Sequence, residues 1–250
     1  MKWKSHLEIA SALSDQLGLP NELRNALRQG SIQPDREGDK VMIRDGRGLL
    51  HRRRMRHHRA TRRFIKGMLW KARVAHLEGR EADAMWCLGR ALHYIQDRSL
   101  AVGPFGWFHD QREGEIGRET ASLEAIQLGE MAAVASPLFV ELCLRSLSPK
   151  RRTSSAMHQA CMLSSAMAFA VLSDPKPDRR RVMELERSER RHAHLLLPFS
   201  LGAAMFVIMV GFTLDEPLIV LFSLPLSAIA LMLDSRLLAL RSEVRWSVPL

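Results

Sequence analysis

The sequence predicts an all-α protein, a multi-helix bundle followed by a C-terminal transmembrane helical hairpin. Over residues 1–194, apolar residues recur at helical spacing and little strand-like alternation is present. Residues 195–214 and 218–233 then form two apolar runs without a charge. With 15 Gly, 11 Pro and 3 Cys in 250 residues, the composition excludes collagen-like, disordered and disulfide-scaffold chains.

The first expected helix is amphipathic and ends at Gly18-Leu19-Pro20. A short helix over residues 21–27 is expected to end at Gly30, and residues 31–50, rich in Asp and Gly, are expected to form a loop. Further helices are expected at 52–77, 81–98, 108–131, 137–147 and 151–172. Residues 174–177 contain two prolines and predict a linker, after which a charged helix begins near residue 178.

These segments predict four parts of the chain. They are a globular helical domain over residues 1–173, a charged linker helix over 174–194, a membrane hairpin over 195–234 and a C-terminal tail over 235–250. The formal net charge is +10, yet residues 195–250 carry four acidic residues and three arginines. The positive excess therefore lies entirely in residues 1–194.

The apolar run over 195–214 is long enough for a membrane span, because 20 helical residues extend roughly 30 Å. The run over 218–233 is shorter. Arg187, Arg190 and Arg191 precede the first run, and Arg236 and Arg241 follow the second. Since arginine and lysine favour the cytoplasmic side, we expect the globular helical domain and both termini in the cytoplasm. The alternative is a buried helical hairpin in a soluble core.

The first ten residues are charged and amphipathic, so we expect no signal peptide. Cys87, Cys143 and Cys161 are scattered without metal-ligand spacing. They are typical of reduced thiols in a cytosolic domain.

Two pairs of histidine and carboxylate residues are spaced one helical turn apart. His93 lies four residues before Asp97, and His109 lies four residues before Glu113, so each pair shares a helix face. Such mixed nitrogen and oxygen ligands suit zinc. The alternatives are solvated ion pairs or, for His93, a hydrogen-bonded core histidine.

Three further segments carry candidate ligands. His57 and His58 lie within residues 51–66, which hold eight lysines and arginines and no acidic residue. That stretch is alternatively a solvated or phosphate-attracting face. Asp35 lies in a segment predicted to be a loop, and His6 lies on the first expected helix.

The order of these motifs resembles the zinc-dependent phospholipase C family, whose superfamily also holds the fungal single-strand-specific zinc nucleases. The ordered motifs are His6, Gly-Ser-Ile-Gln-Pro-Asp at 30–35, His-His at 57–58, Leu-Gly-Arg-Ala-Leu-His-Tyr-Ile-Gln-Asp at 88–97 and His-Asp-Gln-Arg-Glu at 109–113. The resemblance covers about residues 3–172. It implies an all-α bundle with a cluster of three zinc ions in a cleft.

The resemblance also implies ligand sets. Asp35, one of His57 and His58, His93 and Asp97 would hold one zinc ion. Asp97 would bridge to a second zinc ion that His6 also binds. His109 and Glu113 would serve the third, and Asp35 would additionally act as general base.

Two departures from the family pattern bear on this assignment. The secreted enzymes use the α-amino group of a mature N-terminal Trp as a ligand, whereas Trp3 here follows Met1 and Lys2. The family also places a histidine six residues after the bridging aspartate, where this chain has Gly103. The third zinc ion would therefore lack a ligand unless Asp110 or His158 substitutes.

The function expected from these features is membrane-anchored, zinc-dependent hydrolysis of phosphodiesters in phospholipid headgroups. Zinc would activate a water molecule and neutralise charge on the phosphate. Trp107 and Phe108 would line the substrate cleft, and the basic stretch 51–66 would attract an anionic membrane. Nucleic acid is the less favoured partner, because few aromatic side chains are available for base stacking. The alternatives are a zinc-dependent single-strand nuclease and a membrane scaffold that kept the fold without catalysis.

Overall fold

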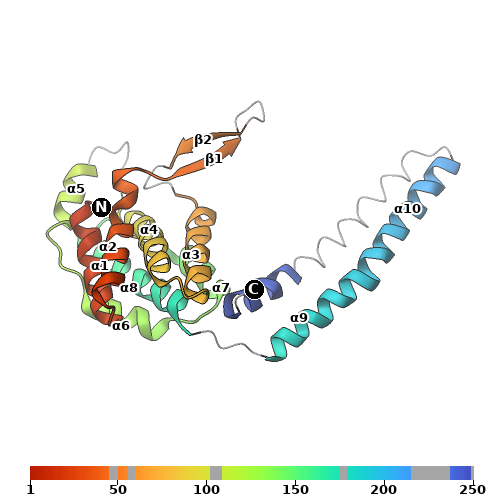
Figure 1. Ribbon diagram of the computed structural model, residues 1–250. Helices are drawn as coiled ribbons and strands as arrows, with labels where there is room; N and C mark the ends of the chain where they lie inside the picture. Colours follow the sequence, from red (N-terminus) through yellow and green to blue (C-terminus); the bar gives the residue numbers. More distant parts are fainter. Residues whose placement is uncertain (45–49, 56–59, 102–108, 175–178, 215–236, 249–250) are drawn as a thin grey trace. The chain divides into compact units, whose positions relative to one another are not determined.

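The computed structural model describes residues 1–250 except 45–49, 56–59, 102–108, 175–178, 215–236 and 249–250 (Figure 1). The chain divides into two compact units, Met1–Asp174 and Pro175–Leu250. Apart from one two-stranded hairpin, the regular structure of the described residues is helical, which confirms the predicted fold class in its coarse form.

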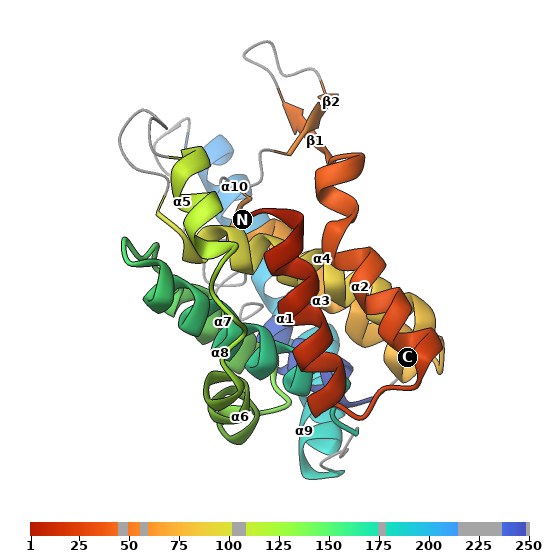
Figure 2. The ribbon, with the colours of Figure 1, turned by 90° about the vertical axis from the view of Figure 1, so that its left-hand side faces the viewer.

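The helices of the first unit pack around two central ones. They are α1 (Trp3–Gln16), α2 (Asn21–Arg36), α3 (Arg62–Leu77), α4 (Glu81–Ser99), α5 (His109–Ile116), α6 (Leu123–Ala132), α7 (Pro137–Ser146) and α8 (Thr153–Leu172). Helix α4 packs against α1, α2, α3 and α8, while α8 also contacts α3, α5, α6 and α7. Helices α1 and α2 run side by side against α4 (Figure 2).

Helices α2 and α4 approach each other through two glycines. A Cβ atom at Gly30 would overlap the carbonyl oxygen of Trp86, and one at Gly89 would overlap the carbonyl oxygen of Leu27. The prediction that Gly30 ends its helix is therefore wrong. This glycine permits a close crossing, and α2 continues through it to Arg36.

Two strands, β1 (Lys40–Arg44) and β2 (Leu50–Arg54), pair in antiparallel fashion and project from the helices (Figure 1). Lys40 pairs with Arg54, and Arg44 pairs with Leu50. The loop expected over 31–50 and the helix expected from residue 52 are wrong here. Helix α3 begins only at Arg62, because the Thr61 side chain accepts a hydrogen bond from the Phe64 amide at 3.2 Å and caps the helix.

The single helix expected over 108–131 is divided into α5 and α6. Helix α5 ends at Ile116, and the Ser122 hydroxyl accepts a hydrogen bond from the Ala125 amide at 3.2 Å, which starts α6. The helices expected at 81–98, 137–147 and 151–172 are confirmed within two residues at each end.

The second unit contains α9 (Arg179–Arg191), a π-helical segment (His192–Leu196) and α10 (Leu197–Thr213), and residues 237–247 are also helical. Leu185 of α9 packs with Leu237 and Val244. An ion pair of 2.8 Å joins Arg241 to Glu189. The apolar run expected to form the second span, residues 218–233, lies outside the described residues.

Within the described part of the chain, α8 alone is long and apolar enough to cross a membrane. However, 72% of its most apolar segment is buried within the helical unit, so its apolar character is that of a core helix. The apolar helical stretch Leu201–Thr213 is shorter than the 18 residues taken as the minimum for a membrane span. The membrane hairpin and its cytoplasmic topology therefore remain predictions.

Candidate metal centre

Three helices bring polar side chains together at one place in the first unit. Helix α1 contributes His6, the C-terminal turn of α2 contributes Asp35, and α4 contributes His93 and Asp97. Both histidines and Asp97 are buried, whereas the Asp35 side chain is 32% exposed. The close crossing of α2 and α4 brings Asp35 beside His93.

The orientation of the His93 ring is set by the backbone of α2. Its Nδ1–H donates to the carbonyl oxygen of Ser31 at 2.9 Å, since a carbonyl can only accept. The Nε2 atom therefore faces the carboxylates, 3.4 Å from Asp97 Oδ2 and 3.7 Å from Asp35 Oδ1. This tautomer presents Nε2 as a metal ligand.

A glutamine sets the orientation of the His6 ring in the same way. Gln96 Nε2 donates to Ser164 Oγ at 3.0 Å, so Gln96 Oε1 is the atom that faces His6. His6 Nδ1–H donates to this oxygen at 2.7 Å. The His6 Nε2 atom then lies 3.3 Å from Asp97 Oδ1. In a metal-ligating histidine, the ring nitrogen that does not bind the metal usually forms a hydrogen bond that fixes the ring orientation.

The resulting donor set is compact. The ring centroids of His6 and His93 are 4.2 Å apart, and one ligand atom each from His6, Asp35 and His93 lies within 4.8 Å of the others. Two imidazole nitrogens and one carboxylate oxygen form a ligand set that zinc accepts, with a position left for water. This cluster could hold a metal ion, and its chemistry fits the expected zinc.

Asp97 is the charged centre of the cluster. Burial alone would raise the pKa of its carboxyl group, but the α-amino group of Met1 and the imidazole of His93 hold it well below its usual range. Burial and the neighbouring His93 lower the pKa of His6. For His93, burial acts in the same direction, but Asp97 and Asp35 raise its pKa above the ordinary value.

The α-amino group of Met1 is a member of this cluster that the sequence did not reveal. It forms ion pairs with Asp97 and, at 3.1 Å, with Glu113 Oε1. His6 Nε2 also lies at hydrogen-bond distance, 3.2 Å, from the carbonyl oxygen of Met1, and because a carbonyl can only accept, a metal ion bound at this nitrogen would replace that contact. Trp3, in contrast, is 60% exposed. An α-amino group therefore lies beside Asp97, the predicted bridging aspartate, but it is the α-amino group of Met1 and not that of a Trp as in the secreted enzymes.

The structure brings together five of the predicted ligands, His6, Asp35, His93, Asp97 and, through Met1, Glu113. His57, His58, Gly103, Trp107 and Phe108 lie outside the described residues, as do the side chains of His109 and Asp110. His158 lines a different cavity of about 540 Å³ near Lys150 and Met162. Gln96, Ser31 and Ser164 were missed, because contacts between distant helices leave no local sequence signal.

Comparisons of the chain with protein-family models, with curated proteins and with solved structures found no match.

Proposed function

We propose that this chain is a membrane-anchored, zinc-dependent phosphodiester hydrolase that acts on phospholipid headgroups, in the manner of the zinc-dependent phospholipases C. The meeting of His6, Asp35 and His93 around Asp97 is the observation that carries this proposal. Four residues from these motifs, His6, Asp35, His93 and Asp97, are thus also neighbours in space.

The two oxygens of Asp97 suit a bridging role. Oδ1 faces His6 and Oδ2 faces His93, at 3.3 and 3.4 Å from the respective Nε2 atoms. Each histidine is oriented by a hydrogen bond at Nδ1, so the two Nε2 atoms and the carboxylate hold a fixed arrangement before any ion binds. Such preorganisation lowers the free energy needed to assemble a metal centre.

Asp35 is the member of the cluster that substrate and solvent can reach. The side chains of His6 and His93 are 0% exposed, whereas Asp35, in the last turn of α2, has 32% of its side chain exposed. When bound, zinc ions would supply a water of lowered pKa and positive charge to offset the charge on a phosphate. Asp35 would orient that water and accept its proton.

The second unit supports membrane attachment. Large apolar side chains of α10 are exposed around the helix: Phe199, Leu201, Met205, Phe206, Met209 and Phe212. Such exposure is unfavourable in water and favourable in lipid. Helix α9, which precedes it, ends with Arg190 and Arg191 in its last turn. Arginines at this position favour the cytoplasmic side, which would place the metal centre there.

Metal content of the purified full chain tests the enzyme proposal. We expect about two zinc ions per chain by elemental mass spectrometry, with loss of zinc in His93→Ala and Asp97→Ala. His158→Ala is the matched control and should retain the metal, because His158 lies at another cavity. Protein that holds no metal and keeps its stability in chelator would overturn the proposal.

The substrate class is then identified by incubating the zinc-loaded chain with vesicles of choline, ethanolamine and inositol phospholipids, or with single-stranded nucleic acid, and measuring the hydrolysis products. Release of a phosphorylated headgroup by the wild type, and not by Asp35→Asn, supports the phospholipase. Nucleotide release alone would identify a nuclease instead. Zinc binding without hydrolysis of either substrate would identify a scaffold.

A further inference from the structure

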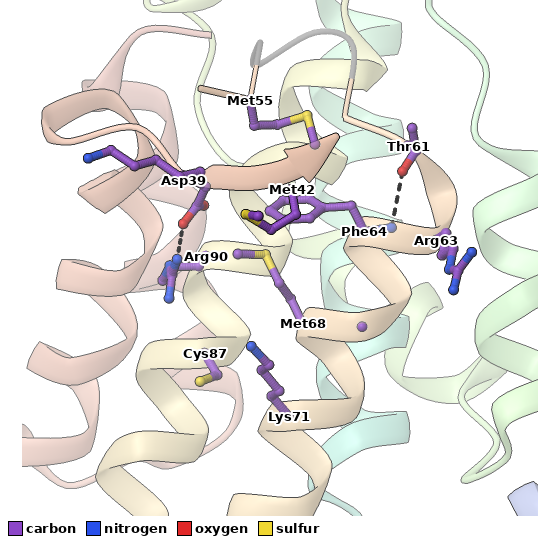
Figure 3. Close-up of a pocket in the computed structure, with 12 residues that line it drawn as sticks. Asp39, Met42, Met55, Thr61, Arg63, Phe64, Met68, Lys71, Cys87 and Arg90 are labelled. Atoms are coloured by element: carbon purple, nitrogen blue, oxygen red, sulfur yellow. Dashed lines mark hydrogen bonds and ion pairs between the residues drawn. The ribbon is translucent and has the colours of Figure 1, made fainter. Parts of the chain in front are cut away.

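A second cavity of about 670 Å³ lies between β1, α3 and α4 (Figure 3). Its volume is that of a small-molecule binding site. Of the candidate metal ligands whose side chains the structure describes, none lines it. The ligand of this cavity can therefore be considered separately from the metal centre.

One wall of this cavity is apolar and contains three methionines. Met42 on β1, Met55 after β2, and Phe64 and Met68 on α3 gather at the same end (Figure 3). Met42 is 57% exposed, so this wall can be reached from outside. Methionine side chains are flexible and polarisable, which suits contact with an alkyl chain.

The remaining lining is strongly basic. Lys40, Arg63 and Lys71 line the cavity and form no ion pair with another residue that the structure describes. The fourth cation, Arg90, pairs with Asp39, the only described acidic residue of the lining. In Figure 3 the Lys71 side chain reaches into the space between Met68 and Cys87. A cavity lined by charges of one sign attracts an anion.

We infer that this cavity binds an anionic amphiphile with one alkyl chain. The alkyl chain lies along Met42, Phe64 and Met68, and a phosphate or carboxylate headgroup lies against Lys71 and its neighbouring cations.

The polar groups of the lining argue against a nucleotide. Thr61 Oγ1 already accepts the amide hydrogen of Phe64, and the Asp39 carboxylate already accepts hydrogen bonds from Tyr94 and Arg90. Reading a base or a sugar requires acceptors as well as donors, and the described lining offers donors from its cations while its acceptors, Thr61 and Asp39, are already engaged. An alkyl chain needs none of them.

Photo-labelling of the full chain in nanodiscs of neutral phospholipid tests this inference. The probe is a C16 fatty acid with a diazirine near the end of its chain, and labelled peptides are located by tandem mass spectrometry. We expect saturable labelling of the peptides that contain Met42 and Met68. Palmitate and palmitoyl lysophosphatidate should compete, while the neutral monopalmitoylglycerol should compete about tenfold less well.

Variants separate this site from general lipid contact. Lys71→Gln and Met42→Asp should each raise the probe concentration for half-saturation by about tenfold. Lys66→Gln is the matched control on α3, since Lys66 pairs with Glu141 and does not line the cavity. It should leave labelling unchanged.

The competitors also identify the source of the anion. Stronger competition by lysophosphatidate indicates a phospholipid, and equal competition by palmitate indicates a fatty acid. Labelling confined to α10, or equal competition by the neutral lipid, would overturn the inference. Labelling should persist in chelator, so failure of the proposed metal centre would leave this result unaffected.

Discussion

The imidazole rings of His6 and His93 lie with their centroids 4.2 Å apart and their planes tilted by 33°, although they belong to different helices. Both are fully buried. Two cationic imidazoles at this separation would repel each other, whereas two neutral ones with Nε2 atoms facing the same carboxylate can share a metal centre.

The orientation of His6 depends on Gln96, so Gln96→Leu should weaken zinc binding about 10- to 100-fold. The variant removes the acceptor at 2.7 Å that keeps hydrogen on Nδ1. Zinc affinity is measured by competition with a chromophoric chelator. Gln159→Leu is the matched control, because Gln159 is also buried but donates to Ser148, away from the cluster. Equal affinities of the two variants would contradict the role of Gln96.

The crossing of α2 and α4 should not tolerate a methyl group. Gly30→Ala places a Cβ atom on the Trp86 carbonyl oxygen and should lower the free energy of unfolding by about 1–3 kcal/mol. Gly67→Ala, in the middle of α3, meets nothing within 4 Å and should be neutral or stabilising by up to about 1 kcal/mol. Denaturant titrations followed by circular dichroism compare them. The close crossing would be refuted if both variants were equally stable.

Arg73 should contribute to stability through the end of α8. Its guanidinium donates to the carbonyl oxygens of Val171 and Ser173 at 2.7 and 2.5 Å, and burial lowers its pKa to about 10. Arg73→Met leaves these carbonyls without their donor and should lower the free energy of unfolding by about 1–3 kcal/mol. The exposed pair of Arg24 and Asp15 provides the control, and Arg24→Gln should change it by less than about 1 kcal/mol. Thermal unfolding that is unchanged in Arg73→Met would contradict this role.

Two thiols should be slow to alkylate. Burial raises the pKa of Cys143 and of Cys161 to about 11. At pH 8 only about one in a thousand such thiols is ionised, and the thiolate is the reactive form. Alkylation by iodoacetamide should therefore accelerate about tenfold for each pH unit up to pH 10. Mass spectrometry of tryptic peptides follows each site, and rapid labelling in the folded chain at pH 8 would contradict burial.

The helices that were predicted well are those whose signals are local. The range expected for α4 was 81–98, because its apolar stripe and the preceding Gly79 are visible in sequence, and the helix spans Glu81–Ser99. Gly30 was misinterpreted because a helix-ending glycine and a glycine at a close helix crossing look alike in sequence. Only the partner helix, with Trp86 at the contact, distinguishes them.

The candidate site was likewise predictable only where its signal is local in the sequence. The pair His93 and Asp97 followed from helical spacing, and the placement of Asp35 beside them was implied only by the family resemblance. The α-amino group of Met1 and the amide of Gln96 could not be predicted, because each meets its partner through a contact between distant segments.

The side-chain amide of Gln96 joins three helices. From α4 it contacts His6 of α1 and Ser164 of α8. Helix α8 contributes no ligand to the cluster that the structure describes. Binding of an ion should nevertheless be felt there, since an ion held by His6 also restrains the amide that anchors Ser164. The backbone amides of α8 would then exchange with deuterium faster in the metal-free protein, and a helix that never touches the ion would report whether it is bound.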